Sequence, residues 1–161
     1  MAGSWSVVEL PNLTEGVNCT VTSPASNRYN CIASAAGENF RNWWPDAFGI
    51  GYWPPGVARS ETTQAFLLAY GTQGFTLCFD GTLEIGIEKI AIFGKGAPGT
   101  EVPTHAALQL ETGHWTSKAA KLRLKPPSKN EAPLRPRVAT SDECSCATPA
   151  NLRRSAAGAA V

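Results

Sequence analysis

Apolar side chains recur at helical spacing over residues 61–70. Ser60 precedes this segment as a favourable N-cap, and Gly71 follows it as a stop signal. The apolar face consists of Ala65, Phe66 and Ala69. This spacing between a cap and a stop predicts a helix. A shorter helix is predicted to begin at Cys31, because the preceding Asn is a good N-cap and Gly37 can end the helix.

The apolar period then changes from helical to extended. Residues 75–79 end at an Asp-Gly pair, and residues 87–93 end at a glycine. Both segments are rich in apolar residues and bounded by turn residues, so both are predicted to be strands. Residues 104–111 and 114–118 are separated by Thr-Gly and alternate in character, which predicts a β-hairpin.

An irregular segment rich in proline and tryptophan lies between the two predicted helices, at residues 42–56. Its prolines exclude a regular helix or a central strand. Two interpretations of its aromatic residues are open: they line a substrate groove, or they pack the segment onto the core. The second is favoured. On the first, the substrate-binding residues would be Trp43, Trp44 and Trp53, together with Trp115 from the hairpin.

Composition favours one folded domain followed by a tail. The chain has 161 residues, 43% of them hydrophobic, which suits a single core. Residues 1–118 hold six Lys/Arg against ten Asp/Glu, whereas residues 119–161 hold eight against three and no aromatic residue. We therefore predict a domain at 5–122 and a flexible basic tail rich in Pro and Ala at 123–161. A solvated or non-native tail is favoured over an arm that binds nucleic acid or another acidic partner.

Cysteine usage indicates a reducing, cytoplasmic setting. The number of cysteines is odd, their spacing is irregular, and the N-terminus has no secretory pattern. No apolar run approaches the roughly 18 residues that a membrane span needs. A metal is not expected, because Cys144 and Cys146 have no second pair and the two histidines lack helical ligand spacing. No other cofactor is expected either. Cys78, within an apolar strand, is predicted to be a buried filler.

Cys31 is the candidate nucleophile. At the start of a helix, the macrodipole and unpaired amides would lower the pKa of its thiol and could hold an oxyanion. The only histidines are His105, near the start of the hairpin, and His114, just after the turn. His105 is favoured as the base. The competing interpretation is that Cys31 is a core residue or vestigial, because free cysteines are usually buried apolar fillers.

The residue that would orient His105 depends on the register of the hairpin. If Thr112-Gly113 is a two-residue turn, Gln109 faces Thr116, and Thr116 lies on the same side as His105. A shift of one residue would present Ser117 instead. Lys118 cannot accept a hydrogen bond from an imidazole. Thr116 and Ser117 both remain candidates.

Five short motifs carry a family resemblance over about residues 28–120. They are Asn-Cys-Ile-Ala from residue 30, Trp-Trp-Pro from 43, Glu-Lys-Ile-Ala from 88, His-Ala-Ala from 105 and Trp-Thr-Ser-Lys from 115. The chain resembles an uncharacterised bacterial domain family with this pattern. It also resembles the NlpC/P60 and CHAP branch of the papain-like cysteine hydrolases, in which a Cys opens a helix and a His begins a strand.

The resemblance implies an α+β, papain-like fold in which a helix packs on a small antiparallel sheet, followed here by a disordered C-terminal tail. It also implies that Cys31 is the nucleophile and His105 the base. We therefore expect a cysteine hydrolase or transferase, such as a thiol peptidase or amidase, that acts on an amide or thioester. Its substrate would be a peptide, a protein or another amide. The alternative is a non-catalytic protein of this fold that binds a peptide or protein through the Trp-rich loop.

Overall fold

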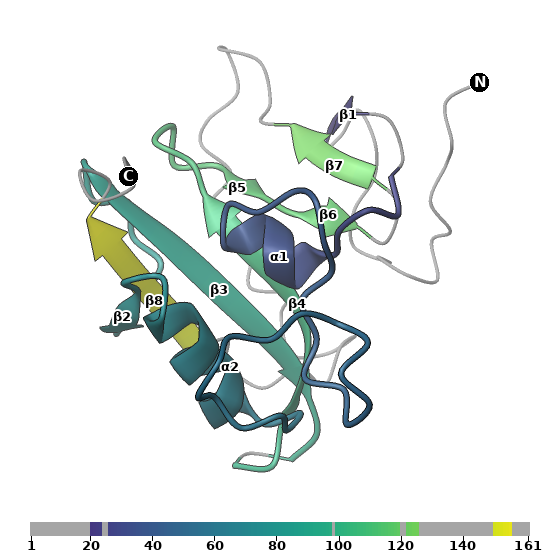
Figure 1. The fold of residues 1–161 in the computed structure, drawn as a ribbon. Coiled ribbons are helices and arrows are strands. Elements are labelled where there is room, and N and C mark those ends of the chain that lie inside the picture. Colours follow the sequence, from purple (N-terminus) through teal and green to yellow (C-terminus); the bar gives the residue numbers. More distant parts are fainter. Residues whose placement is uncertain (1–19, 24–25, 98, 120–121, 126–149, 156–161) are drawn as a thin grey trace.

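The computed structural model describes residues 20–23, 26–97, 99–119, 122–125 and 150–155. These residues form an α+β fold with two antiparallel sheets (Figure 1). A five-stranded sheet has the order β2-β8-β3-β4-β5, and a three-stranded sheet has the order β1-β7-β6. The elements are β1 (Thr20–Ser23), α1 (Cys31–Ala35), α2 (Thr63–Gly71), β2 (Thr76–Cys78), β3 (Ile87–Lys95), β4 (Val102–Gln109), β5 (Trp115–Thr116), β6 (Lys118–Ala119), β7 (Leu122–Lys125) and β8 (Ala150–Ser155).

The short helix α1 begins and ends where the sequence predicts. The Asn30 side chain caps its first turn by accepting a hydrogen bond from the Ala33 amide at 3.1 Å. Gly37 follows the helix with φ of 83°, a left-handed conformation that suits glycine. Its amide bonds to the Ser34 carbonyl at 3.0 Å, and the next amide bonds to the Ala33 carbonyl at 2.9 Å. This pair of bonds satisfies two carbonyls of the last turn.

The longer helix α2 begins at Thr63, two residues after its predicted start. Its N-cap is Thr62, whose hydroxyl accepts from the Ala65 amide at 3.3 Å. The expectation that Ser60 caps this helix is wrong. The Ser60 hydroxyl instead lies 3.1 Å from the Thr62 hydroxyl, so it supports the cap from outside the helix.

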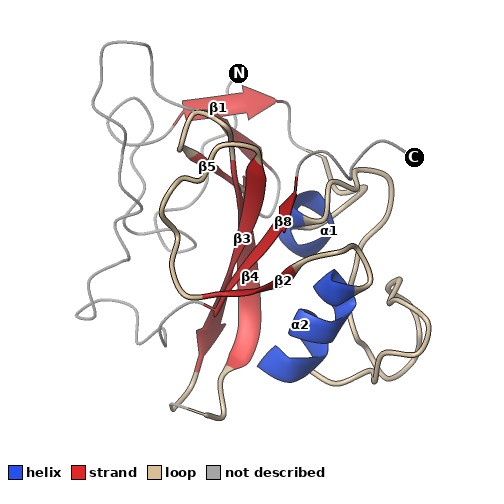
Figure 2. Ribbon diagram, turned by 90° about the vertical axis from the view of Figure 1, so that its left-hand side faces the viewer, coloured by secondary structure: helices blue, strands red, loops and turns tan. Residues whose placement is uncertain are grey.

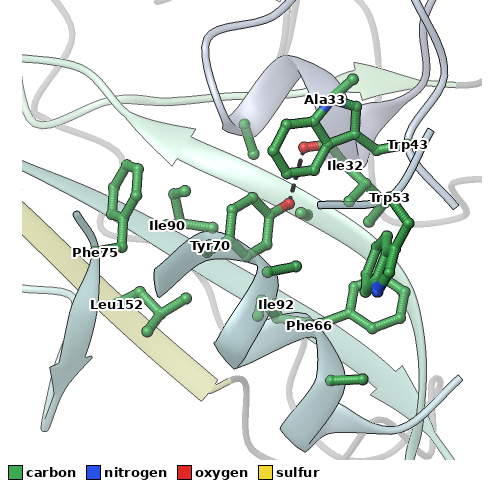
Figure 3. Packing of buried hydrophobic residues seen from close by; sticks show 14 residues of the cluster. Ile32, Ala33, Trp43, Trp53, Phe66, Tyr70, Phe75, Ile90, Ile92 and Leu152 are labelled. Atoms are coloured by element: carbon green, nitrogen blue, oxygen red, sulfur yellow. Dashed lines mark hydrogen bonds between the residues drawn. The ribbon is translucent and has the colours of Figure 1, made fainter. Parts of the chain in front are cut away.

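Both helices lie on the same side of the large sheet (Figure 2). The main core fills the space between the helices and this sheet. Ile32 from α1, Phe66 and Tyr70 from α2, and Ile90 from β3 are all fully buried there. The Tyr70 hydroxyl donates to the Ile32 carbonyl at 2.9 Å, which joins the two helices through a buried hydrogen bond (Figure 3). Leu152 of β8 completes this face.

Two tryptophans of the irregular segment belong to this core. Trp43 is 1% exposed and Trp53 is 5% exposed, and Figure 3 shows both among the aliphatic and aromatic side chains of the cluster. Trp53 meets Phe66 edge to face at a centroid distance of 5.0 Å. The interpretation that these two residues line a groove is therefore wrong, and the favoured packing interpretation is confirmed for them.

The hairpin between β4 and β5 has a three-residue loop rather than the expected two-residue turn. The Leu110 amide bonds to the His114 carbonyl at 2.7 Å, and the Gly113 amide bonds back to the Leu110 carbonyl at 2.8 Å. Gly113 has φ of 82°, as three-residue hairpin loops require of their last residue. Gln109 therefore pairs with Trp115, and Leu108 pairs with Thr116. The register is shifted by one residue from the two-residue alternative.

Strand β8 corrects the predicted domain boundary. It lies inside the large sheet between β2 and β3, although it belongs to the stretch 123–161 that was predicted to be flexible. Leu152 is buried opposite Ile90, and Arg154 forms an ion pair with Glu88 at 2.5 Å. Residues 122–125 also form a strand, β7. The tail prediction is wrong for these two strands. Residues 5–19, the tail cysteines and most of the predicted tail lie outside the described residues.

Candidate functional site

Cys31 is the first residue of α1. The side chain of the preceding Asn30 holds the backbone at this point through hydrogen bonds to the helix and to Trp43. The Asn30 side-chain oxygen accepts from the amides of Ala33 and Trp43, at 3.1 and 3.2 Å. Its amide nitrogen donates to the Trp43 carbonyl at 2.7 Å. One asparagine therefore caps the helix and ties its start to the buried Trp43, so the backbone that carries Cys31 is held by the core.

The thiol of Cys31 is partly buried, and burial raises its pKa above the ordinary value. Hydrogen bonding from the backbone at Ala106 and Ile32 counteracts this, as does the positive charge of Lys118. The net direction is upward, so the thiol is protonated at neutral pH. The backbone amides at the helix start do lower the pKa, as expected, but burial outweighs them, so the expectation of a net lowering is wrong.

His105 and Ser117 are brought together. The Ser117 hydroxyl oxygen lies 2.6 Å from Nε2 of His105 and donates its own hydrogen to the Ala106 carbonyl at 2.7 Å. A hydroxyl has one hydrogen to donate. Because that hydrogen is used at Ala106, the short contact to His105 requires Nε2–H to be the donor. Nδ1 is then the nitrogen with a free lone pair, which is the basic atom of a neutral imidazole.

The one-residue register shift explains why Ser117, rather than Thr116, reaches His105. Thr116 pairs with Leu108 at the end of β5. The strand is interrupted at the next residue, Ser117, before Lys118 and Ala119 pair with β7. At this break the Ser117 hydroxyl donates to the Ala106 carbonyl of β4. The alternative that sequence left open is resolved in favour of Ser117 as the partner of His105.

The His105 imidazole is neutral at physiological pH. Although the residue keeps some exposure, its ring is enclosed by protein, and burial lowers its pKa to about 4. The ring lies 6.0 Å from that of Phe93, its cross-strand neighbour on β3. The resting pair is therefore a neutral thiol and a neutral imidazole, not an ion pair.

The Cys31 thiol and the His105 ring both lie near Ala106 of β4, but on opposite faces of the strand. The core-facing Ala106 belongs to the cluster beneath the helices, and successive side chains of a strand point to opposite faces. His105 therefore leaves the strand on the other face, and its ring bonds to Ser117 at the edge. Within the described residues, no hydrogen bond joins Cys31 Sγ to the His105 ring. The thiol instead lies beside the Ala106 backbone, one peptide unit from His105.

The other residues proposed from sequence lie elsewhere. Trp44 is partly exposed, and its indole donates to Glu61 at 2.9 Å. The Trp115 indole packs against Gly81, where an added Cβ would lie 3.1 Å from the ring. His114 directly follows the hairpin loop, with Nδ1 3.0 Å from the Thr112 hydroxyl.

Lys118 is a residue of this region that sequence reasoning set aside. Its side chain is buried, with the residue 3% exposed. Its ammonium group donates to the Ser26 carbonyl and lies 4.3 Å from the centre of the Tyr29 ring. Both partners come shortly before Cys31 in the chain. The Trp-x-Ser-Lys motif contained the signal, because this Lys directly follows the Ser that holds His105.

A second buried lysine, Lys89 of β3, lies in a different cluster. Its ammonium group contacts Glu84 at 2.6 Å and Asp80 at 3.4 Å. These carboxylates, Cys78 and Arg153 help to line a cavity of about 120 Å³. Cys78 is partly exposed, and its thiol bonds to the Asp80 carbonyl at 3.4 Å. The expectation that Cys78 is a buried filler is wrong, because β2 turns most of its residues toward solvent.

Among the residues that the structure describes, no group of three or more His, Cys, Asp or Glu side chains is arranged to hold a metal ion. No helix in the same part of the chain has the length and apolar character to cross a membrane.

Comparison with known proteins found one family. The model of a domain of unknown function, DUF7689, matches residues 20–126, which include Cys31, His105, Ser117 and Lys118. Neither the curated proteins nor the solved structures contain a match.

Proposed function

Because the chain belongs to the DUF7689 family of domains of unknown function, we propose its activity from its own residues: a cysteine hydrolase or transferase that acts on an amide or thioester, with a papain-like arrangement of Cys31 and His105. The observation that carries the proposal is the Ser117 hydroxyl, which bonds to Ala106 and leaves His105 with a basic Nδ1.

In the proposed reaction the neutral His105 acts as a general base. The β4 backbone separates its ring from the Cys31 thiol in the resting structure, so the reaction requires substrate binding to bring Nδ1 to hydrogen-bond distance of Sγ. Nδ1 then accepts the thiol proton while Sγ forms a bond to the substrate carbonyl carbon. The imidazolium then gives that proton to the leaving amine or thiolate as its bond to the carbonyl carbon breaks. The product is an acyl thioester on Cys31, which water or a second nucleophile cleaves with His105 again accepting a proton.

Ser117 would act on this reaction through His105. It holds Nε2–H, so the ring keeps the tautomer in which Nδ1 is free. It also limits rotation of the ring, which matters because the thiol and the imidazole must approach to hydrogen-bond distance in the reactive complex. The papain-like assignment rests on this order of elements: a Cys at a helix start, a His on β4, against which that helix packs, and a polar residue at the break between β5 and β6.

The test is acylation of native protein by a panel of peptide thioesters and p-nitrophenyl esters, followed by mass spectrometry. Wild-type protein should form an acyl adduct on the Cys31 peptide and release it with time. Cys31→Ala should lose the adduct and keep the melting temperature within a few degrees, because the thiol is only partly buried. Cys78→Ala is the matched control and should retain the adduct. Labelling of Cys78 alone, or of neither thiol, would reject the proposal.

A non-catalytic binding role is the second candidate, and one observation favours it. Phe48 and Ile50 are 90% and 88% exposed at the tip of the irregular segment. Asp46 fixes this tip by accepting from the amides of Phe48, Ile50 and Gly51, at 3.1, 2.9 and 2.7 Å. A rigid loop with two exposed apolar side chains suits contact with a protein. Adduct formation that needs Cys31 would separate the catalytic proposal from this one.

A further inference from the structure

Lys118 joins two parts of the candidate site that are far apart in the sequence. It follows Ser117, which holds His105, and its ammonium group contacts the Ser26 carbonyl and the Tyr29 ring. Ser26 and Tyr29 lie on the segment that enters α1 at Cys31. Helix α1 itself packs against β4 and β6. Ser117 and Lys118, which are adjacent in the chain, thus contact both His105 and the backbone segment that leads to Cys31.

The position of this cation is unusual for a lysine. Lysine side chains are seldom fully buried, because their charge loses hydration. Here the residue is 3% exposed, and the ammonium group is held at one point by a carbonyl and an aromatic face. A fixed charge in a weakly hydrated region acts on neighbouring groups more strongly than a charge in water does.

We propose that Lys118 is a positioning residue for Cys31, whose buried ammonium group anchors the segment leading into α1 and stabilises the thiolate that forms when Cys31 loses its proton. This inference rests on the proposed role of Cys31. It adds a third group to the reaction scheme: His105 removes the proton, Ser117 orients His105, and Lys118 favours the anion left on sulfur.

Among the described residues, two titratable groups interact electrostatically with the Cys31 thiol: Tyr70 on α2 and Lys118 on β6. Burial raises the pKa of Tyr70 well above its ordinary value, so its hydroxyl is neutral over the range in which a thiol ionises. His105 lies on the other face of β4 and is neutral over the same range. Lys118 is therefore the group of the two whose charge opposes the effect of burial on the thiol.

The experiment measures the rate of iodoacetamide alkylation of the Cys31 peptide in the native full chain from pH 6 to 10. Peptide-resolved mass spectrometry separates Cys31 from the other cysteines. In Lys118→Met, we expect the midpoint of the rate profile to rise by about one pH unit, which slows alkylation about tenfold below the midpoint. Lys118→Arg keeps the charge and should stay within about twofold of wild type. Lys89→Met removes the other buried lysine and should leave the profile unchanged.

Folding is checked by circular dichroism in each variant. If Lys118→Met loses the native spectrum, Lys118→Gln replaces it, because its amide can still donate to the Ser26 carbonyl without a charge. An unchanged midpoint in a folded uncharged variant would overturn the proposal, as would an equal shift in Lys118→Arg. If Cys31→Ala abolishes acyl-adduct formation while Lys118→Gln leaves the profile unmoved, the inference alone fails. If the profile moves but no acylation is found, the proposed function alone fails.

Discussion

Two thiols of this protein lie in regions that contain a buried lysine, and the regions differ in what else they contain. Around Cys78, Lys89 contacts Glu84 and Asp80, whose carboxylates raise its pKa against the opposing effect of burial. Around Cys31, Lys118 contacts a carbonyl and an aromatic ring. Of the two regions as the structure describes them, the one around Cys31 contains a histidine with an assigned tautomer. A thiol and a lysine are thus common to both, and the oriented base distinguishes the candidate site.

The two buried lysines, Lys89 and Lys118, also differ in the parts of the structure that they hold together. Lys89 holds the loop that carries Asp80 and Glu84 against the sheet, and its charge is matched locally by those carboxylates. Lys118 ties together two backbone segments that carry the proposed reacting groups. Burial of a charge is costly in both places. At Lys89 the ion pairs with Glu84 and Asp80 offset that cost, and at Lys118 the bond to the Ser26 carbonyl and the contact with the Tyr29 ring contribute.

The largest expected difference between the regions is in their response to acid. The pKa of His105 is about 4 in the folded protein and about 6.5 in an unfolded chain. Because the folded value is the lower one, the unfolded state binds the proton more readily. Stability is complete above pH 6.5 and falls as the pH drops toward 4, by about 3 kcal/mol in total.

Urea unfolding at pH 7.5 and 4.5 checks this. His105→Gln should remove most of the loss between these values, and His114→Gln should not. The Lys89 region should respond at lower pH, because Asp80 and Glu84 have lowered pKa values, chiefly through hydrogen bonds from Thr82 and Lys89 respectively. A wild-type stability that does not change between pH 7.5 and 4.5 would contradict the burial of His105.

The second effect concerns the orientation of the imidazole. Ser117→Ala removes the partner of Nε2–H and should lower the acylation rate of Cys31 about 100-fold, because the ring is then free to adopt the wrong tautomer or rotamer. Ser34→Ala removes a hydroxyl from α1 instead and serves as the control. Equal rates in Ser117→Ala and wild type would show that the contact is structural.

A smaller effect is expected at the helix start. Asn30→Ala removes the N-cap of α1 and two bonds to Trp43, and should lower the free energy of unfolding by about 1–2 kcal/mol. It should also slow alkylation of Cys31 less than Lys118→Met does, because it changes no charge. Urea unfolding and the alkylation assay measure the two effects on the same protein. A larger change in Cys31 reactivity than that of Lys118→Met would mean that the Asn30 cap, and not Lys118, has the main effect on the thiol.

The smallest effect is expected in the second region. Glu84→Gln keeps the size of the side chain and leaves Asp80 beside Lys89, so the midpoint of urea unfolding should fall only slightly. The alkylation profile of Cys31 should remain that of wild type. A shifted Cys31 profile would mean that the two regions are electrostatically coupled and that Lys89 also acts on the Cys31 thiol.

Local signals in the sequence were sufficient for the elements that depend on neighbouring residues. Asn30 and Gly37 delimit α1 through hydrogen bonds within a few residues, and the β3 and β4 patterns place their strands correctly. The start of α2 was misplaced because Ser60 and Thr62 both have the chemistry of a cap. Only the backbone conformation around them decides which hydroxyl meets a free amide.

Features that depend on distant residues were not predictable in the same way. Strand β8 has polar and charged residues, and its place in the sheet comes from pairing with β2 and β3, which lie over 50 residues earlier in the chain. Compositional reasoning about Pro and Ala does not detect such pairing. For the same reason, the tryptophans at 43 and 53 could not be assigned to core or groove before the position of α2 was known.

The sequence by itself determined which groups are available: a cysteine at a capped helix start, two histidines on one hairpin, and a Ser-Lys pair after it. It also limited the partner of His105 to Thr116 or Ser117, because side chains alternate along a strand. The tertiary structure decided between them through the length of the hairpin loop. It also decided the protonation states, because the pKa of a thiol or imidazole depends on how much water the packed chain removes.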